Sequence, residues 1–261
     1  MTRARTGEAS AKAKTTTRAA KKPLVGASSR PTGAESTTFG PETFAFLRAL
    51  ERNNDREWFE SHRAQYEAHV RAPALRFIAA MSGELGKLSE HFVADARPVG
   101  GSLMRIHRDV RFSPDKSPYK TNIGMHFRHD VGKNVHAPGV YLHIAAKDCF
   151  LGVGLWRPEP DALAAIRRRI VERPSEWAKV RGGTAFKNAW KIAGDSLARP
   201  PKGFDPEHPH LADLKRKDHI ASAELAAADV GDVDLAKKVG KRLAAASDYL
   251  KFLCNALELQ F

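Results

Sequence analysis

The sequence predicts an α+β domain in which an antiparallel sheet packs against helices. Apolar residues recur at helical spacing before residue 90 and again after residue 235, whereas they alternate with polar residues over roughly 102–156. These alternating stretches are short and follow one another closely, so consecutive strands are expected to pair as an antiparallel meander. We therefore expect a sheet of about four or more strands, packed against N-terminal, middle and C-terminal helices.

Three helices are predicted before the sheet. The first follows Phe39 and has Pro41 in its first turn, where a missing N–H costs nothing. Asn54 or Asp55 can cap the second helix, in which aromatic residues recur at helical spacing. Pro73 opens the third helix. Its apolar positions are Leu75, Ile78, Met81, Leu85 and Leu88.

The predicted strands cover residues 103–108, 121–128, 140–144 and 149–156. Each strand has an apolar face and a polar or aromatic face, because successive side chains point to opposite sides. If the four strands pair in order, the polar face gathers Arg105, His107, Asn122, His126, Tyr141, His143 and Trp156. Gly152 and Gly154 belong to the same face, where they leave either a depression suited to a ligand or room for a packed helix.

The second half of the chain completes the expected core. Asp161 can cap a helix that continues to about residue 171, and helical spacing returns over 235–257. Between 172 and 218 the pattern is weak, and the expected core anchors there are Trp177, Phe186 and Trp190. Cys149 and Cys254 are far apart in sequence and have no CxxC context, so we expect two buried, unpaired thiols.

The chain carries a net charge of +13, which is distributed unevenly. Residues 1–38 hold eight Lys or Arg against two Glu and almost no large apolar side chain, so we expect a disordered basic tail before a single domain over 39–261. The tail suits either weak, salt-dependent binding of nucleic acid or simple solubility. No apolar run approaches the ~18 residues that cross a bilayer, so we expect no membrane partner and a cytoplasmic location.

The strongest candidate for a functional site is the basic block over residues 105–122, RIHRDVRFSPDKSPYKTN. Its two Ser-Pro steps stiffen a loop whose cations form a rim suited to phosphate or carboxylate groups. Asp109 and Asp115 either hold the arginines in place or supply an acid or base, and His107 is a third catalytic candidate. The predicted anion contacts are Arg105, Arg108, Arg111, Lys116 and Lys120, with Tyr119, Tyr141 and Trp156 available to stack on a ring.

The chain lacks the motifs of several common catalytic and cofactor sites. It has no GxSxG elbow, no GxxxxGKS loop and no GxGxxG after a strand. Neither HExxH nor a carboxylate–histidine pair at ligand spacing accompanies the histidines of the strand region, which are His107, His126, His129, His136 and His143. His208 and His210 form a weaker candidate in a loop. We therefore predict no metal site, assign no cofactor, and leave open whether the protein is an enzyme.

Four sequence blocks follow one another over residues 39–257. They are FAFLRALERNNDREWFESHRAQYE, RIHRDVRFSPDKSPYKTNIG, YLHI followed by GVGLWRPEPDALAAIRRRI, and PPKGFDPEHP. In this order they resemble the conserved hypothetical family called domain of unknown function 2461, found in bacteria and fungi. The resemblance implies a single α+β domain and supplies neither a reaction nor catalytic residues.

Three functions fit these residues. The first is a cytoplasmic domain, enzymatic or not, that binds an anionic small molecule at the basic block; it predicts that at least three of the five cationic heads converge. The second is a nucleic-acid-associated protein that uses the basic tail and the cationic rim. The third is a structural or partner-binding domain in which the block is an internal network of ion pairs.

Overall fold

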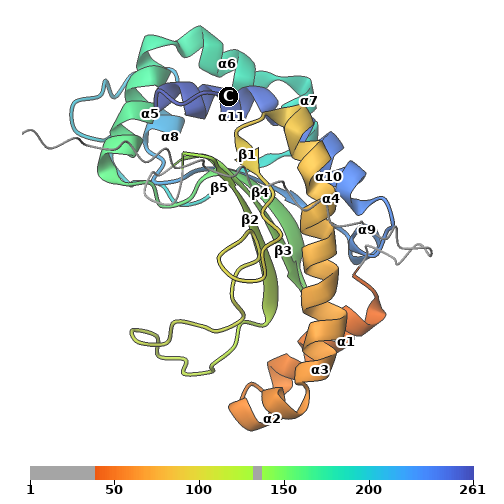
Figure 1. Ribbon diagram of the computed structural model, residues 1–261. Helices are drawn as coiled ribbons and strands as arrows, with labels where there is room; N and C mark the ends of the chain where they lie inside the picture. Colours follow the sequence, from red (N-terminus) through yellow and green to blue (C-terminus); the bar gives the residue numbers. More distant parts are fainter. Residues whose placement is uncertain (1–38, 132–136) are drawn as a thin grey trace, which may run out of the picture. The chain divides into compact units, whose positions relative to one another are not determined.

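A six-stranded antiparallel sheet lies at the centre of the computed structural model, which describes residues 39–131 and 137–261 (Figure 1). The strands are β1 (Phe92–Val93), β2 (Asn122–His129), β3 (Gly139–Ala145), β4 (Cys149–Leu155), β5 (Lys191–Ala193) and β6 (His219–Glu224). Their spatial order is β1-β2-β3-β4-β6-β5. All described residues belong to one compact unit. The predicted basic tail, residues 1–38, lies outside the described residues.

The α+β fold is confirmed, and β2, β3 and β4 form the predicted meander. The first predicted strand, 103–108, is not regular; it makes only isolated bridges, from Leu103 to Met125 and from His107 to Tyr119. The sheet extends beyond the predicted strands through β1, β5 and β6. The sequence of β6, HIASAE, consists mostly of small and polar residues, so its alternation carries little apolar signal.

The N-terminal helices are α1 (Pro41–Arg52), α2 (Arg56–Ser61), α3 (Arg63–Tyr66), a π-helical turn η1 (Glu67–Arg71) and α4 (Ala72–Leu88). The second predicted helix is therefore broken at His62, whose backbone lies outside the helical region. Asp55 caps α2, because its carboxylate accepts a hydrogen bond from the Trp58 N–H at 2.8 Å.

The later helices are α5 (Pro160–Glu172), α6 (Pro174–Gly182), α7 (Thr184–Ala189), α8 (Leu211–Leu214), α9 (Ala227–Val230), α10 (Leu235–Ala244) and α11 (Ser247–Ala256). Asp161 lies inside the first turn of α5 and does not cap it, because the helix begins at Pro160. The C-terminal helical stretch is divided into α10 and α11. The predicted anchors Trp177, Phe186 and Trp190 are buried, as are both free cysteines.

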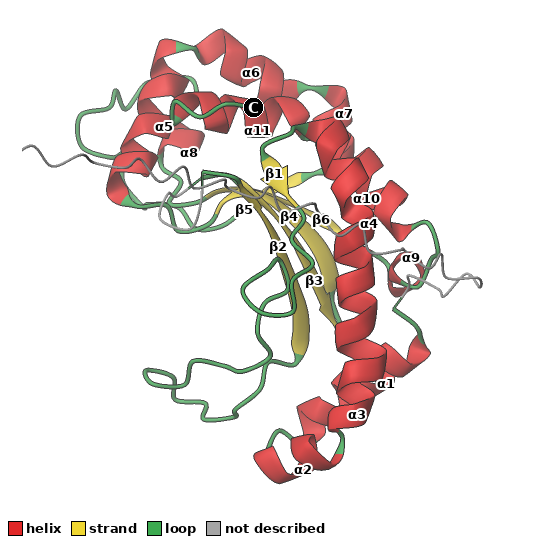
Figure 2. Ribbon diagram, in the orientation of Figure 1, coloured by secondary structure: helices red, strands yellow, loops and turns green. Residues whose placement is uncertain are grey.

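The two faces of the sheet differ in their surroundings. Helices α4 and α10 run side by side along one face (Figure 2). The strand residues on that side are fully buried, and they include Ile123, Met125, Phe127, Val140, Leu142, Ile144, Leu151 and Val153. On the other side, alternate residues of the same strands are only half-buried. We call this side the open face and define it by Asn122, His126, Tyr141, His143, Phe150 and Gly152.

Within the described part of the chain, every helix is too short or too polar to cross a bilayer.

Candidate ligand-binding face

Strand pairing places the polar residues of the open face in two adjacent rows. In one row His126 lies opposite Tyr141, and Tyr141 lies opposite Gly152. In the next row His143 lies opposite Phe150, while Asn122 begins β2 at the end of the face. Four of the predicted ligand contacts, Asn122, His126, Tyr141 and His143, are therefore brought together as expected.

His143 connects these side chains. Its Nδ1 accepts hydrogen bonds from the Tyr141 hydroxyl at 3.2 Å and from the Asn122 amide at 3.4 Å. The remaining ring nitrogen, Nε2, must then carry the proton, and it faces the Asp148 carboxylate at 3.6 Å. The imidazole stacks on the Phe150 ring with centroids 4.7 Å apart. The hydrogen bonds and the stacking together fix both the orientation and the tautomer of His143.

Both histidines of the open face are uncharged at neutral pH. Burial lowers the pKa of His143, and the nearby Asp148 only partly opposes this shift. Burial, helped by the Arg128 charge, lowers the pKa of His126 to about 4. A neutral imidazole that faces a hydroxyl on one side and a carboxylate on the other is able to exchange a proton with a bound ligand. The open face thus offers neutral hydrogen-bonding groups and aromatic surface, but no fixed charge of its own.

The two glycines of β4 have different roles. A methyl group added at Gly152 would find its nearest atom, the Tyr141 Cβ, at 3.8 Å, so no helix packs there and the position leaves free space on the open face. Gly154 has a φ of +111°, and an added methyl group would lie 2.1 Å from the His219 carbonyl oxygen. Gly152 therefore leaves room for a methyl group on the open face, whereas Gly154 lets the backbone of β6 approach closely.

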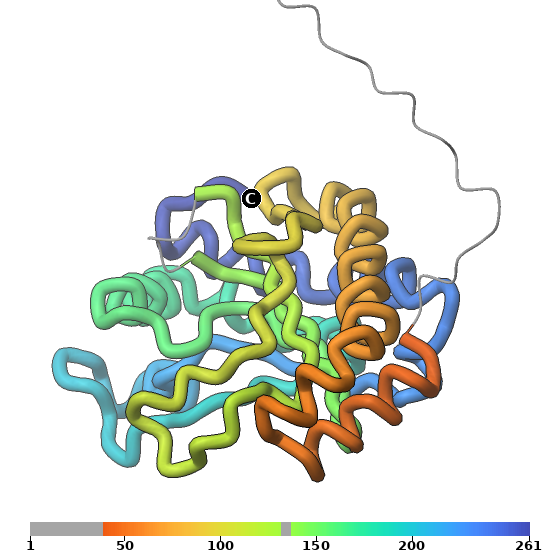
Figure 3. Tube along the Cα trace, turned by 60° about the horizontal axis from the view of Figure 1, so that its bottom comes forward, coloured from red at the N-terminus to blue at the C-terminus, as the bar shows by residue number. Residues whose placement is uncertain are grey.

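The basic block folds as an irregular hairpin beside β2. The Arg108 N–H donates to the Pro118 carbonyl at 2.9 Å, and the Lys120 N–H donates to the Ile106 carbonyl at 2.8 Å. Figure 3 shows this segment, in yellow-green, next to the first helices. A side-chain clamp joins the two parts: the Asn54 amide donates to the Tyr119 carbonyl at 2.9 Å and accepts from the Tyr119 N–H at 3.0 Å.

Both aspartates of the hairpin are occupied by neighbouring residues. Asp115 pairs with Arg108 and accepts from the Ser117 hydroxyl at 2.6 Å, and hydrogen bonds from Ser117, more than Arg108, lower its pKa to about 2. Asp109 binds Arg111 through two hydrogen bonds of 2.9 and 2.7 Å, which lower its pKa to about 2. These contacts favour the reading in which the aspartates hold the arginines. A carboxylate with so low a pKa is a poor general base at neutral pH.

The remaining cations of the block have no carboxylate partner among the described residues. Lys116 donates to the Val110 carbonyl at 3.0 Å near the exposed tip of the hairpin. Lys120 donates to the Arg105 carbonyl at 3.1 Å, and burial, followed by repulsion from the Arg105 charge, lowers the pKa of its ammonium group. Arg105 is exposed. Lys120 and Arg105 are thus neighbouring positive charges. No carboxylate among the described residues forms an ion pair with either of them, although the Arg105 charge also acts on the Asp109 carboxylate and adds to the lowering of its pKa.

Three of the predicted site residues lie apart from the open face. Tyr119 is buried, and its ring stacks on Phe59 of α2 with centroids 4.1 Å apart. His107 lies beside that buried tyrosine, with ring centroids 5.2 Å apart. Trp156 is 67% exposed, and the Arg157 guanidinium lies over its ring at 4.7 Å. The expected face made of all seven polar strand residues is therefore only partly formed.

The chain matches a family described as Conserved hypothetical protein (DUF2461) over residues 42–252. The chain belongs to this family. No match was found among the curated proteins or among the solved structures. The DUF2461 match covers both the open face and the hairpin, and it confirms the resemblance seen in the four sequence blocks.

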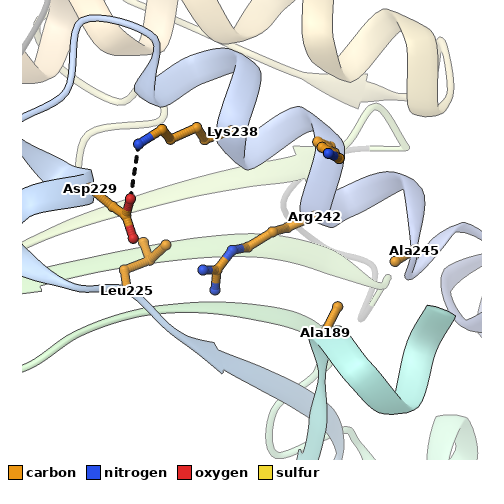
Figure 4. Close-up of a pocket in the computed structure, with 7 residues that line it drawn as sticks. Ala189, Leu225, Asp229, Lys238, Arg242 and Ala245 are labelled. Carbon is orange, nitrogen blue, oxygen red and sulfur yellow. Dashed lines mark hydrogen bonds and ion pairs between the residues drawn. The ribbon is translucent and has the colours of Figure 1, made fainter. Parts of the chain in front are cut away.

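The DUF2461 domain also has a groove away from the basic block, with a volume of about 380 Å³ (Figure 4). Helix α10 lines it with Lys238, Lys241 and Arg242. The Lys238 ammonium is bound by Asp229 at 2.9 Å and by Asp232 at 2.9 Å, and the Arg242 guanidinium donates to the Glu224 carbonyl at 2.5 Å. Two of the three cations of the groove are therefore already bound to acceptors of the domain. For this reason the groove is a weaker candidate for anion binding than the place where Lys120 and Arg105 lie.

Several residues that build the site were not predicted. Asn54 was expected only as a helix cap, yet it ties the hairpin to α2 across 65 positions. Asp148 and Phe150 orient His143, although Asp148 was expected only in a turn and Phe150 was not among the predicted ligand contacts. A period-two reading of β4 does place Phe150 with His143, but nothing in the sequence signals the Asn54 contact.

Proposed function

We propose that this domain binds a small molecule that carries a phosphate or carboxylate group, with Lys120 and Arg105 as the anion contacts. The observation that carries the proposal is the half-buried ammonium of Lys120 beside a second cation, without a carboxylate partner among the described residues. Two adjacent positive charges repel each other, and partial burial adds a desolvation cost. The attraction of a bound anion offsets both penalties.

The expected convergence of at least three cationic heads is not seen among the hairpin contacts, so the proposal is limited to Lys120 and Arg105. Arg108 and Arg111 are held by Asp115 and Asp109, so they keep the loop in shape and have less charge to offer a ligand. Lys116 sits at the exposed tip, where solvent screens its charge. Lys120 is followed two residues later by Asn122, where the open face begins. An anion held by Lys120 is thus positioned near the hydrogen-bonding groups of that face.

The open face supplies the rest of the recognition. Gly152, which has no side chain, lies next to Tyr141 in the neighbouring strand, and Phe150 and His143 form a stacked aromatic pair in the adjacent row. Such a surface suits a planar group with hydrogen-bonding atoms, since it combines aromatic area with neutral donors and acceptors. If the domain is an enzyme, His143 is the group best placed to exchange a proton with the ligand.

The test is a calorimetric titration of the full chain with inorganic phosphate and with pyrophosphate. Lys120→Met keeps the apolar stem and removes the charge, and Arg105→Gln removes the second charge. Each is expected to weaken binding at least tenfold. Lys116→Met is the matched control within the same loop. Lys241→Met tests whether the anion binds in the groove on α10 instead. Neither variant should change the affinity. Equal binding by all four variants, or a loss confined to Lys241→Met, would refute the proposed site.

A nucleic-acid-associated function rests on a separate observation, the +6 charge of residues 1–38. The expected result is weak, salt-dependent binding of duplex DNA by the full chain, which disappears when residues 1–38 are removed. Absence of binding at low salt with the tail present would eliminate this function. A cytoplasmic location belongs to the same set of proposals and fits either function.

A further inference from the structure

Three potential metal ligands meet where β1 pairs with β2, at a place unrelated to the anion site. They are His91, His129 and Asp130, and their ligating atoms all lie within 4.8 Å of one another. The Asp130 carboxylate faces both imidazoles: one oxygen is 2.9 Å from the His91 Nδ1, and the other is 3.1 Å from the His129 Nδ1. The two rings are parallel, with centroids 5.2 Å apart. One carboxylate and two imidazole nitrogen atoms therefore form a close cluster.

The hydrogen bonds of His129 indicate that its inner nitrogen, Nδ1, is an acceptor. Its Nε2 is 2.9 Å from the Gln260 carbonyl oxygen, which can only accept, so Nε2 carries the proton. The Val131 N–H donates to Nδ1 at 3.3 Å, which agrees with an unprotonated Nδ1. This nitrogen nevertheless faces a carboxylate oxygen at 3.1 Å, and its side chain is only 1% exposed. An acceptor nitrogen and a carboxylate oxygen at this separation are both able to contact one bound cation.

The backbone holds the three ligands in place before any ion arrives. His129 is the last residue of β2 and pairs with Phe92, directly after His91. The Asp130 N–H donates to the His91 carbonyl at 2.8 Å, and the His91 N–H donates to the Ser89 hydroxyl at 3.1 Å. The Gln260 carbonyl acts as a second-shell acceptor for His129, an arrangement that metal-bound histidines commonly use.

We propose that His91, His129 and Asp130 bind a divalent ion of the zinc class. Imidazole nitrogen together with a single carboxylate is a donor set that zinc and neighbouring transition metals prefer, whereas calcium and magnesium prefer oxygen ligands. In a tetrahedral zinc site with bonds of about 2.0–2.2 Å, ligand atoms lie about 3.3–3.5 Å apart, so only small side-chain shifts are required. Binding releases the proton of the His91 Nδ1, which faces the Asp130 carboxylate, to the solvent. Asp130 is 45% exposed on the solvent side, where water completes the coordination.

The experiment uses the full chain without a histidine tag, stripped with a chelator and then equilibrated with zinc chloride. Elemental analysis after desalting should find about one zinc ion per chain. Cobalt(II) should give the visible absorption of a four-coordinate ion. Asp130→Asn and His91→Gln are expected to lower the zinc affinity at least tenfold. Both positions retain some solvent exposure, and circular dichroism without metal checks that each variant folds.

His208→Gln is the matched control, because His208 and His210 form another close histidine pair, with ring centroids 5.8 Å apart. This variant should bind zinc as the unmodified chain does. Zinc should also raise the melting temperature of the unmodified chain and of His208→Gln, but not that of Asp130→Asn. The inference is overturned if the unmodified chain retains no zinc, or if all three variants bind it with equal affinity.

Discussion

The Asn54 clamp gives the sharpest prediction about what holds the basic hairpin in place. The Asn54 side chain makes two hydrogen bonds to the backbone of Tyr119, whose side chain is 3% exposed and stacked on Phe59. Asn54→Ala removes both partners at once. The Tyr119 N–H and carbonyl then lose their partner in the half-buried region between α2 and the hairpin.

The expected loss of stability follows from these two bonds. Each hydrogen bond contributes about 0.5–1.5 kcal/mol net, and a buried group left without a partner costs more. Because Asn54 is only half-buried, water can reach part of the vacated space, so we expect a total loss of about 2 kcal/mol. In a domain of this size, such a loss lowers the melting temperature by about 4–8 °C.

Asn53→Ala is the matched control, since Asn53 is the preceding residue and has the same side chain. Its amide donates to the Ala49 carbonyl at 2.9 Å, within the same helix end, and the residue is exposed. The control should cost about 0.5 kcal/mol or less. Urea denaturation gives the free energy of unfolding of each variant from the midpoint and slope of its curve. A difference of less than about 0.5 kcal/mol between the two variants would refute the clamp.

Two further predictions concern β4 and β6. Gly154→Ala should destabilise the fold by about 3 kcal/mol or more, because φ is positive and the added methyl group would lie 2.1 Å from the His219 carbonyl oxygen. The control Gly152→Ala should be neutral or slightly stabilising, and equal melting temperatures of the two variants would contradict this prediction. Burial lowers the pKa of His219 from 6.5 to about 3, so the unfolded chain takes up this proton first as the pH falls, and stability drops by about 1.4 kcal/mol per pH unit between those values. Neither ring nitrogen of His219 finds a hydrogen-bond partner among the described residues, so His219→Leu should remove that slope without loss at pH 7, as urea titrations from pH 7 to 4 would show.

The parts of the fold that sequence patterns predict are those with strong apolar periodicity. The meander was predictable because Ile123, Val140 and Leu151 alternate cleanly with polar residues. Strand β6 was missed because Ala221 and Ala223 are small, and their burial depends on the neighbouring strand rather than on their own hydrophobicity. The break between α10 and α11 was missed because helical spacing continues on both sides of it.

The candidate site was predictable only where it follows strand alternation. Tyr141 and His143 share a face because they are two residues apart in one strand, and that relation needs no tertiary information. The hairpin is irregular, so alternation there wrongly assigned His107 to the open face, whereas pairing with Tyr119 carries it toward α2. The meeting of His91 with His129 depends on the pairing of β1, a two-residue strand that has no sequence signature.

Some charged residues of the hairpin hold the shape of the loop, whereas Lys120 is proposed to bind the anion. The Arg111–Asp109 pair is largely exposed, so it adds little stability, and the loop is held mainly by Ser117 on Asp115 and by the Asn54 clamp. Lys120 behaves differently, since burial and the Arg105 charge both act against its ammonium group. Lys120→Met should therefore leave the free protein as stable as before, or slightly more stable, while it weakens anion binding at least tenfold. Asn54→Ala should weaken stability and binding together, because it releases the hairpin that carries Lys120. If Lys120→Met instead destabilised the free protein as much as Asn54→Ala does, Lys120 would be a structural residue and the case for an anion at this position would fail.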